Sequence, residues 1–299
     1  MADRLIGAIE AGGTKFVVAL AQEDGTILAR TRIPTAHPDV TLPAVRQFFE
    51  KSAATHGRVN AFGIASFGPL DLDRLSPSYG AFTTTPKPGW HGVRYHDALA
   101  SFGAPIGLDT DVNGAAIGEW LEGAGRDCRI VAYTTVGTGI GTGVVHDGRP
   151  LGGISHYEAG HIFVPHDRER DPFPGICAYH GDCVEGLAAG PAIEKRFGAS
   201  LDNLGPAEVD LVAEYLSYLA STLVLLHMPD RLIFGGGVMK TPRLVEALRY
   251  ATEQRLAGYI EHPRLDVGLA TYITTPQLGD DAGIRGAIQL GRDALAQLP

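Results

Sequence analysis

Two cysteines and two histidines have the spacing of a metal site. Cys177, His180 and Cys183 form a Cys-x-x-His-x-x-Cys run, and His161 lies sixteen residues before it. Two thiolates and two imidazoles suit tetrahedral Zn²⁺, and four protein ligands leave no open position, so the predicted role is structural. The alternative is a pair of buried thiols with histidines on the surface. The tight spacing favours zinc.

Other histidines leave the fourth ligand open. His146, His156 and His166 lie near the run in the sequence, and each is otherwise expected to be a solvated loop residue. The remaining cysteine, Cys128, is expected to be a small buried residue. Three cysteines provide no disulfide framework, which agrees with a reducing compartment.

Three glycine-rich turns have the composition of phosphate-binding loops. A phosphate close to the backbone needs exposed amide donors and no Cβ in the way, and a threonine hydroxyl adds a donor. The chain has no GxxxxGK[ST] motif, and no GxGxxG run precedes an expected helix. One such turn is ordinarily a simple hairpin, but three in one chain favour a nucleotide site. The candidate residues are Gly12, Gly13, Thr14, Lys15, Gly137, Thr138, Gly139, Gly235, Gly236 and Gly237.

The segment from Asp109 to Asn113 places two carboxylates at the expected start of a helix. Phosphoryl transfer needs one carboxylate that orients and deprotonates the attacking hydroxyl, and Asp111 is the candidate for this general base. The alternative is an ordinary helix N-cap, for which aspartate is well suited. The helix dipole would keep the carboxylate ionised, and strong basicity is not required when the transition state is loose.

The elements that carry these residues follow one plan twice. Residues 5–9 and 16–21 are apolar strands on either side of the first glycine turn, and residues 130–135 and 142–145 repeat this arrangement around the second. The copies start about 125 residues apart, which is too long for a solenoid repeat and indicates an internal duplication of one domain type. Because the glycine turns are hairpins, the sheets are expected to be mixed.

Helices alternate with strands along the rest of the chain, which predicts an α/β protein. We place the domain change near residue 112. The smaller domain is expected to comprise residues 1–112 joined by the C-terminal helix at 282–299, and the larger domain residues 113–281 with the zinc loop. The helices expected from periodicity cover residues 41–56, 112–121, 211–227 and 282–298.

Two further segments have ordinary explanations. In the loop Pro86–Trp90, Trp90 could close over a sugar and Lys87 could meet a hydroxyl or phosphate, but a rigid connector is the more common role. The charged segment 167–171 is expected to be a solvated loop.

Composition excludes several classes of protein. The 299 residues, 44% of them hydrophobic, suffice for two domains with large cores. The net charge of −9 argues against nucleic acid as a partner but not against a nucleotide. No window approaches 18 consecutive apolar residues and no secretory leader is recognisable, so neither a membrane span nor export is expected. The expected location is the cytoplasm.

Taken in their order along the chain, these motifs resemble those of the ROK family (repressor, open reading frame, kinase). Within the family they resemble those of the bacterial fructokinases. The resemblance extends over essentially the whole chain. Residues 10–15 are similar to the family's first phosphate motif, residues 158–161 to its sugar-binding and zinc signature, and residues 177–186 to the fructokinase form of its zinc loop. The turn at residues 235–237 is similar to the family's adenosine-side turn.

The resemblance implies an actin-like ATPase (ribonuclease H-like) fold with two α/β domains, mixed sheets and an interdomain cleft. It implies a homodimeric sugar kinase that uses ATP and Mg²⁺, with Asp111 as catalytic base and Glu10 in the outer shell of Mg²⁺. The implied zinc ligands are His161, Cys177, His180 and Cys183. The implied sugar-binding residues are Gly68, Pro69, Thr110, Asn113, Glu158 and His161.

Two departures from the family pattern bear on the substrate. Most members have aspartate where this chain has Glu10. Glucose-specific members have asparagine where it has Thr110, and three cysteines in the zinc loop. The second departure favours phosphorylation of fructose to fructose 6-phosphate over the same reaction with mannose, glucose or an N-acetylated hexose. The alternative from another class is a sugar-sensing regulator without catalysis, which the negative charge and a first strand starting at Leu5 disfavour.

Overall fold

The computed structural model describes residues 4–85, 87–265 and 267–297, and these form two compact units. Unit 1 comprises Met1–Leu121, Pro150–His156 and Asp280–Pro299, and unit 2 comprises Glu122–Arg149 and Tyr157–Gly279. Whether these units are the two domains predicted at residues 1–112 with 282–299 and at 113–281 stays a prediction.

Unit 1 is built on a five-stranded mixed sheet in the order β3-β2-β1-β4-β5. Strands β1, β2 and β3 are antiparallel neighbours, whereas β4 and β5 run parallel to β1. The strands are β1 (Leu5–Ala11), β2 (Lys15–Gln22), β3 (Ile27–Pro34), β4 (Val59–Ser66) and β5 (Ile106–Thr110).

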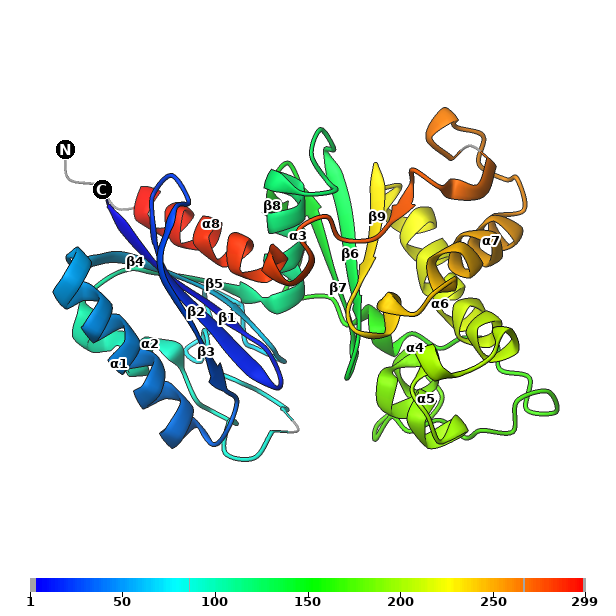
Figure 1. The fold of residues 1–299 in the computed structure, drawn as a ribbon, viewed down its shortest axis with the longest axis horizontal. Helices are drawn as coiled ribbons and strands as arrows, with labels where there is room; N and C mark the ends of the chain where they lie inside the picture. The colour runs from blue at the N-terminus through cyan, green and yellow to red at the C-terminus, as the bar shows by residue number, and fades with distance from the viewer. Residues whose placement is uncertain (1–3, 86, 266, 298–299) are drawn as a thin grey trace. The chain divides into compact units, whose positions relative to one another are not determined.

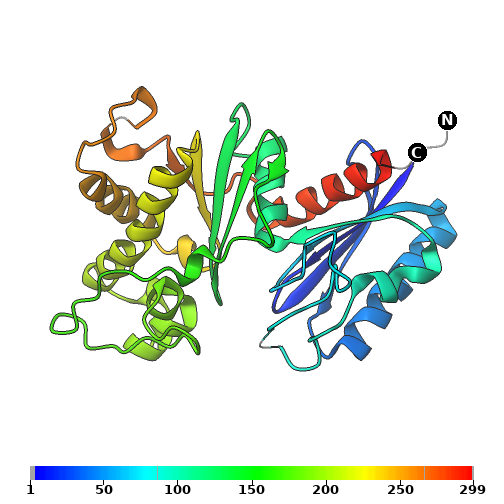
Figure 2. The same cartoon turned by 180° about the vertical axis from the view of Figure 1, so that it is seen from behind.

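Helices cover both faces of this sheet, which explains why β1, β2 and β4 are apolar almost without a break. Phe62 points to the face covered by α1, where it packs on Phe49. Its neighbour Gly63 points to the other face, where a Cβ would meet the backbone of α8. Figures 1 and 2 show α8, the end of the chain, lying along the sheet formed by its beginning. The helices are α1 (Pro38–His56), α2 (Tyr95–Leu99), α3 (Asp111–Glu122) and α8 (Ala282–Ala296).

Unit 2 contains a second five-stranded mixed sheet, in the order β10-β9-β6-β7-β8. Its strands are β6 (Ile130–Val136), β7 (Ile140–His146), β8 (Arg149–Pro150), β9 (Arg231–Gly235) and β10 (Ile273–Thr274). Its helices are α4 (Val184–Ala188), α5 (Gly190–Phe197), α6 (Pro206–His227) and α7 (Leu244–Leu256), of which α6 and α7 pack against each other (Figure 1).

The two sheets share one topology. In each, the first strand pairs antiparallel with the second around a glycine turn, and parallel with the fourth. The third strand extends one edge and the fifth the other. This agreement supports the internal duplication that the repeated strand–turn–strand pattern indicates, and it confirms the mixed sheets.

One helix of the described residues, α6, is long and apolar enough to cross a membrane by length and composition. However, 61% of its apolar stretch is buried inside the protein, where α6 packs on α4 and α7. This is the pattern of a core helix. The helix begins at Pro206, five residues before the start expected at Leu211, and this proline lies in its first turn.

Candidate active site

Asp111 lies in the first turn of α3, directly after β5. The capping bond is made by Thr110, whose hydroxyl accepts the backbone N–H of Asn113 at 3.2 Å. The Asp111 carboxylate instead accepts the N–H of Val112 at 2.9 Å. The N-cap explanation therefore applies to Thr110, and the helix start places Asp111 where the dipole favours its ionised form.

Asp109 and Asn113 fix the backbone on either side of Asp111. The Asp109 carboxylate accepts the side-chain amide of Asn113 at 2.6 Å and the N–H of Thr110 at 2.7 Å. Burial raises the pKa of Asp109, and these hydrogen bonds partly oppose the rise. Asn113 is itself buried, so its amide holds the turn, and its predicted contact with a sugar stays a prediction.

Glu10 ends β1 on the face that α8 covers. Burial raises its pKa to about 7, the nearby Asp111 carboxylate adds to the rise, and Lys15 and Arg30 oppose it. Its Oε2 is buried and has no hydrogen-bond partner among the described residues. A buried carboxylate oxygen beside a second carboxylate fits a cation better than it fits an unpaired charge.

Replacing Glu10 with glutamine should change how stability depends on pH. Because the pKa is raised from 4.5 to about 7, the unfolded chain ionises first, and stability falls as pH rises through that window. Glutamine removes this loss, which amounts to about 3 kcal/mol at most. In magnesium-free buffer, melting curves should show Glu10→Gln gaining on the wild type from pH 4.5 to 7 and no further above it. The exposed control Glu50→Gln should show no such gain, and a constant difference for Glu10→Gln would contradict the expectation.

The first glycine turn joins β1 and β2 in unit 1. Gly12 donates its N–H to Lys15 and accepts the Thr35 hydroxyl at 2.8 Å, which fixes the turn, while Gly13 and Thr14 are exposed. A Cβ on Gly13 would lie 3.6 Å from Cε of Lys87, so this lysine extends over the turn.

The other two glycine turns lie next to each other in unit 2. The N–H of Gly137 bonds to Gly139 within the β6–β7 turn, and the N–H of Gly190 at the start of α5 bonds to Gly137 at 2.8 Å. Gly236, which follows β9, has φ +94°, and a Cβ there would lie 2.3 Å from the carbonyl oxygen of Val136. The turn after β9 therefore depends on glycine at position 236 for its close approach to β6.

The four predicted zinc ligands come together in unit 2, all within 4.8 Å of one another. Nδ1 of His161 lies 3.7 Å from Sγ of Cys177 and 3.5 Å from Sγ of Cys183, and Nδ1 of His180 lies 3.6 Å from Sγ of Cys177. Tetrahedral zinc with bonds of about 2.3 Å to sulfur and 2.0–2.1 Å to nitrogen requires S···N edges of about 3.6 Å. Burial raises the pKa of Cys183 to about 11, which a bound cation would offset.

The competing histidines have other contacts. His156 belongs to unit 1 and accepts the N–H of Leu70 through Nε2. His146 lies beside Arg129 and Asp147. His166 is 4% exposed and is therefore not a solvated loop residue.

Glu185 is a site residue that motif reasoning did not single out. Its carboxylate accepts the N–H of Ile140 at 2.9 Å, directly after the second glycine turn, and its other oxygen lies 3.9 Å from Nε2 of His161. Gly160, in the segment that carries His161, lies so close to Ile140 that a Cβ would be 1.9 Å from its carbonyl oxygen. The zinc loop and the second glycine turn thus share one backbone anchor. The sequence signal that could have identified Glu185 is its position two residues after Cys183.

The expectation that Trp90 could close over a sugar is wrong. Trp90 is 1% exposed, packs on Phe16 and Phe82, and donates its indole N–H to Ala36. It is a core residue of unit 1, because its large apolar ring stabilises the fold more when it is buried than when it is exposed to solvent. Pro86, at the start of the predicted loop, lies outside the described residues. Gly68 and Pro69 lie two and three residues after the end of β4, and their contact with a sugar stays a prediction.

The expectation of a solvated loop at residues 167–171 is also partly wrong. Asp171 is buried, accepts the hydroxyl of Tyr215 at 2.6 Å, and lies 3.3 Å from the buried guanidinium of Arg196. His166 bridges this cluster to the zinc loop, because its Nδ1 lies 3.0 Å from the Asp182 carboxylate. A buried carboxylate needs such partners, and the sequence pattern did not show them.

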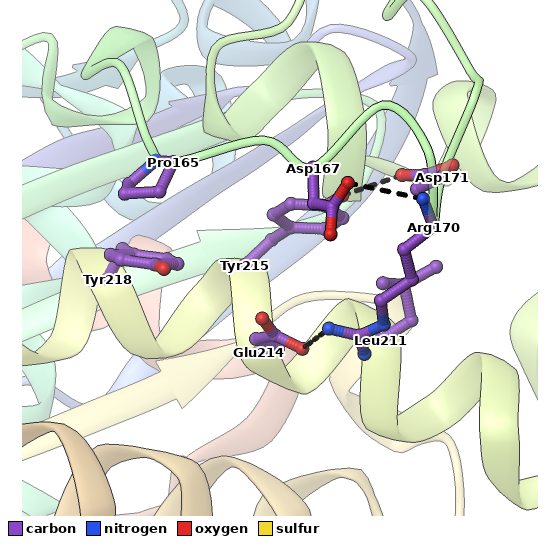
Figure 3. A pocket seen from close by; sticks show the side chains of 8 residues that line it. All are labelled: Pro165, Asp167, Arg170, Asp171, Leu211, Glu214, Tyr215 and Tyr218. Carbon is purple, nitrogen blue, oxygen red and sulfur yellow. Dashed lines mark hydrogen bonds and ion pairs between the residues drawn. The ribbon is translucent and has the colours of Figure 1, made fainter.

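Figure 3 shows the small pocket beside this cluster. Its volume is about 90 Å³. Arg170 and Glu214, two of the residues that line it, form an ion pair of 2.7 Å. Of the described residues that line it, none is a predicted catalytic, sugar-binding or nucleotide-binding residue. The pocket lies between the segment 165–171 and α6.

Comparison with known proteins identifies the family. The ROK family profile matches residues 6–294. The chain is 43% identical over 294 residues to the fructokinase of Zymomonas mobilis, covering 96% of each chain, and 40% identical to the fructokinase of Pediococcus pentosaceus, covering 97% of this chain and 99% of that one.

Solved structures agree with the fold. The ROK hexokinase from Thermus thermophilus superposes with a TM-score of 0.79 at 26% identity, over 98% of this chain and all of that one. A ROK family glucokinase from Streptomyces griseus, in complex with glucose and AMPPNP, superposes with a TM-score of 0.74 at 24% identity, over 97% and 99% of the two chains. These similarities confirm the predicted actin-like α/β fold. The chain belongs to the ROK family.

Proposed function

We propose that this protein is an ATP-dependent fructokinase that transfers the γ-phosphoryl group to the 6-hydroxyl of fructose. The observation that carries the kinase assignment is the start of α3, where Thr110 makes the capping bond and Asp111 stands next to it in the first turn. Four curated fructokinases and one putative fructokinase, with 36–43% identity over nearly the whole chain, support fructose as the sugar.

Asp111 orients the sugar 6-hydroxyl and takes its proton as the bond to phosphorus forms. Its place in the first turn of α3 keeps it ionised before the sugar binds. Asp109 and Asn113 hold that turn through their 2.6 Å hydrogen bond, so the carboxylate is oriented before the reaction.

Unit 1 also supplies the first phosphate turn and the metal carboxylate. The exposed amides of Gly13 and Thr14 donate to phosphate oxygens, with Lys15 next to them. Glu10 would hold Mg²⁺ in its outer shell, which fits its unpartnered buried Oε2. When bound, Mg²⁺ neutralises phosphate charge as it develops in the transition state.

Unit 2 provides the remaining phosphate and sugar contacts. The turn at residues 137–139 donates amides to the phosphates, and the turn at residues 235–237 lies on the adenosine side. Glu158 and His161 bind sugar hydroxyls, as their resemblance to the family's signature suggests. Zinc, held by His161, Cys177, His180 and Cys183, fits the S···N spacings of 3.5–3.7 Å and would fix the loop that carries the sugar-binding pair.

We further propose that the protein acts in the cytoplasm as a homodimer, with ATP and a small sugar as its ligands and no nucleic acid or membrane. The net charge of −9 supports the absence of nucleic acid among its partners.

Release of ADP from Mg·ATP by the purified protein tests the assignment. Turnover should be strongest with fructose and negligible without sugar, and kcat/KM for fructose should exceed that for glucose roughly tenfold or more. Mannose and N-acetylglucosamine complete the series, and Asp111→Asn controls for contaminating kinases. Preference for glucose would retain the kinase and overturn the substrate. Absence of sugar-dependent ADP release in the zinc-loaded protein would favour a sugar-sensing regulator.

A further inference from the structure

Gly283, in the first turn of α8, adjoins the carboxylate that we assign to Mg²⁺. A Cβ at this position would lie 2.6 Å from Cδ, 2.7 Å from Oε1 and 2.8 Å from Cγ of Glu10. These distances are far below van der Waals contact, so the Glu10 side chain occupies the space that any other residue at position 283 would fill.

The surrounding contacts between α3 and α8 are of a different kind. A Cβ on Gly286 would lie 1.7 Å from the carbonyl oxygen of Gly114, and a Cβ on Gly118 would lie 2.2 Å from that of Ala282. Substitution there would push two helix backbones apart. At position 283 the nearest atoms belong to one side chain, so a substitution would displace the carboxylate while the backbone can stay in place.

The Glu10 side chain has little room to lie anywhere other than next to Gly283. It leaves β1, whose neighbours on the sheet are buried, and it ends near Asp111, whose charge repels it. Glutamate is one methylene longer than the aspartate that the ROK resemblance implies at this position. The longer side chain lies against Gly283 of α8, in the space that a Cβ there would occupy.

We propose that Gly283 is a positioning residue for the phosphoryl transfer: its missing side chain provides the space that sets where the Glu10 carboxylate points. The proposal rests on the proposed function, because it takes Glu10 to be the magnesium carboxylate. It places a determinant of the active site in the last helix of the chain, more than 270 residues from the motif it serves.

A double-mutant cycle with Gly283→Ala and Glu10→Ala tests the proposal. In the wild-type background, Gly283→Ala should lower Tm by about 2–6 °C in magnesium-free buffer, because the site is overpacked. It should also lower kcat roughly 10–100-fold and raise the Mg²⁺ concentration for half-maximal rate, since the carboxylate is displaced. In the Glu10→Ala background, the same change should leave kcat unaltered and should hold or raise Tm, because alanine favours the helix and nothing remains to clash.

The control is Gly153→Ala, whose Cβ would meet nothing within 4 Å, and it should change neither Tm nor kcat. Equal effects of Gly283→Ala on Tm in both backgrounds would overturn the positioning role. If Glu10→Ala itself retains full activity and Mg²⁺ dependence, the magnesium assignment in the proposed function fails, while the Tm cycle still reports whether the two residues share the space.

Discussion

Replacing Asp111 with asparagine is expected to lower kcat by roughly 10²–10⁴-fold, the range that a positioned general base contributes. Asparagine keeps the shape of the side chain and can still accept the N–H of Val112, so α3 should begin at the same residue. It cannot take the proton of the sugar 6-hydroxyl. Sugar affinity, measured by calorimetry without ATP, should therefore change by no more than a few-fold.

A matched control is available at Asp39, in the first turn of α1, whose side chain is 89% exposed. Asp39→Asn makes the same chemical change at a helix start and should leave kcat unchanged. If Asp111→Asn instead abolished sugar binding and kept the turnover of the bound fraction, the residue would be a sugar ligand and the base would have to be sought elsewhere. The split between kcat and affinity thus decides the role.

The parts of the site that were predictable are those that depend on neighbours in the sequence. Glycine turns between apolar strands predicted both hairpins, since glycine between two strand patterns is a strong turn signal. The run from Cys177 to Cys183 predicted a metal site because ligands three residues apart share one turn of a loop. His161, which the family resemblance favoured over three other histidines, lies together with Cys177, His180 and Cys183.

The parts that were missed depend on contacts between distant segments. Asp171 looked like one of five charged loop residues, yet its partners Tyr215 and Arg196 are brought to it by α5 and α6. Trp90 looked exposed because prolines surround it, but an aromatic cluster of unit 1 encloses it. Hydrophobic periodicity and composition indicate which secondary structure a segment prefers. They do not indicate which residues of distant segments the fold packs against it.

If the proposed zinc site is correct, replacing Cys183 with serine is expected to prevent zinc binding and to lower Tm by about 10 °C or more, as the loss of a structural metal implies a loss of several kcal/mol. Cys183 is completely buried, caps α4 through its bond from the N–H of Gly186, and contributes one of two thiolates. A serine hydroxyl is a poor zinc ligand, and the three remaining ligands cannot close the tetrahedron. Metal analysis of the purified variant and its melting curve provide the two measurements.

The contact between Glu185 and Ile140 extends this expectation to the nucleotide. Glu185 belongs to the zinc loop and lies 3.9 Å from Nε2 of His161, and its carboxylate accepts the N–H that follows the second glycine turn. Release of zinc should therefore raise KM for ATP as well as for sugar, because the turn loses its anchor together with the loop.

The control is Cys128→Ser, which removes the other buried thiol, outside the cluster, and should keep both the zinc and KM for ATP. The metal assignment would be wrong if Cys183→Ser retained a full equivalent of zinc, or if its Tm equalled that of Cys128→Ser. If zinc were lost and only the sugar constant rose, the site would be structural but the link through Ile140 would be broken. A rise in both constants is the outcome that we expect, since the Ile140 amide that follows the second glycine turn also anchors the zinc loop through Glu185.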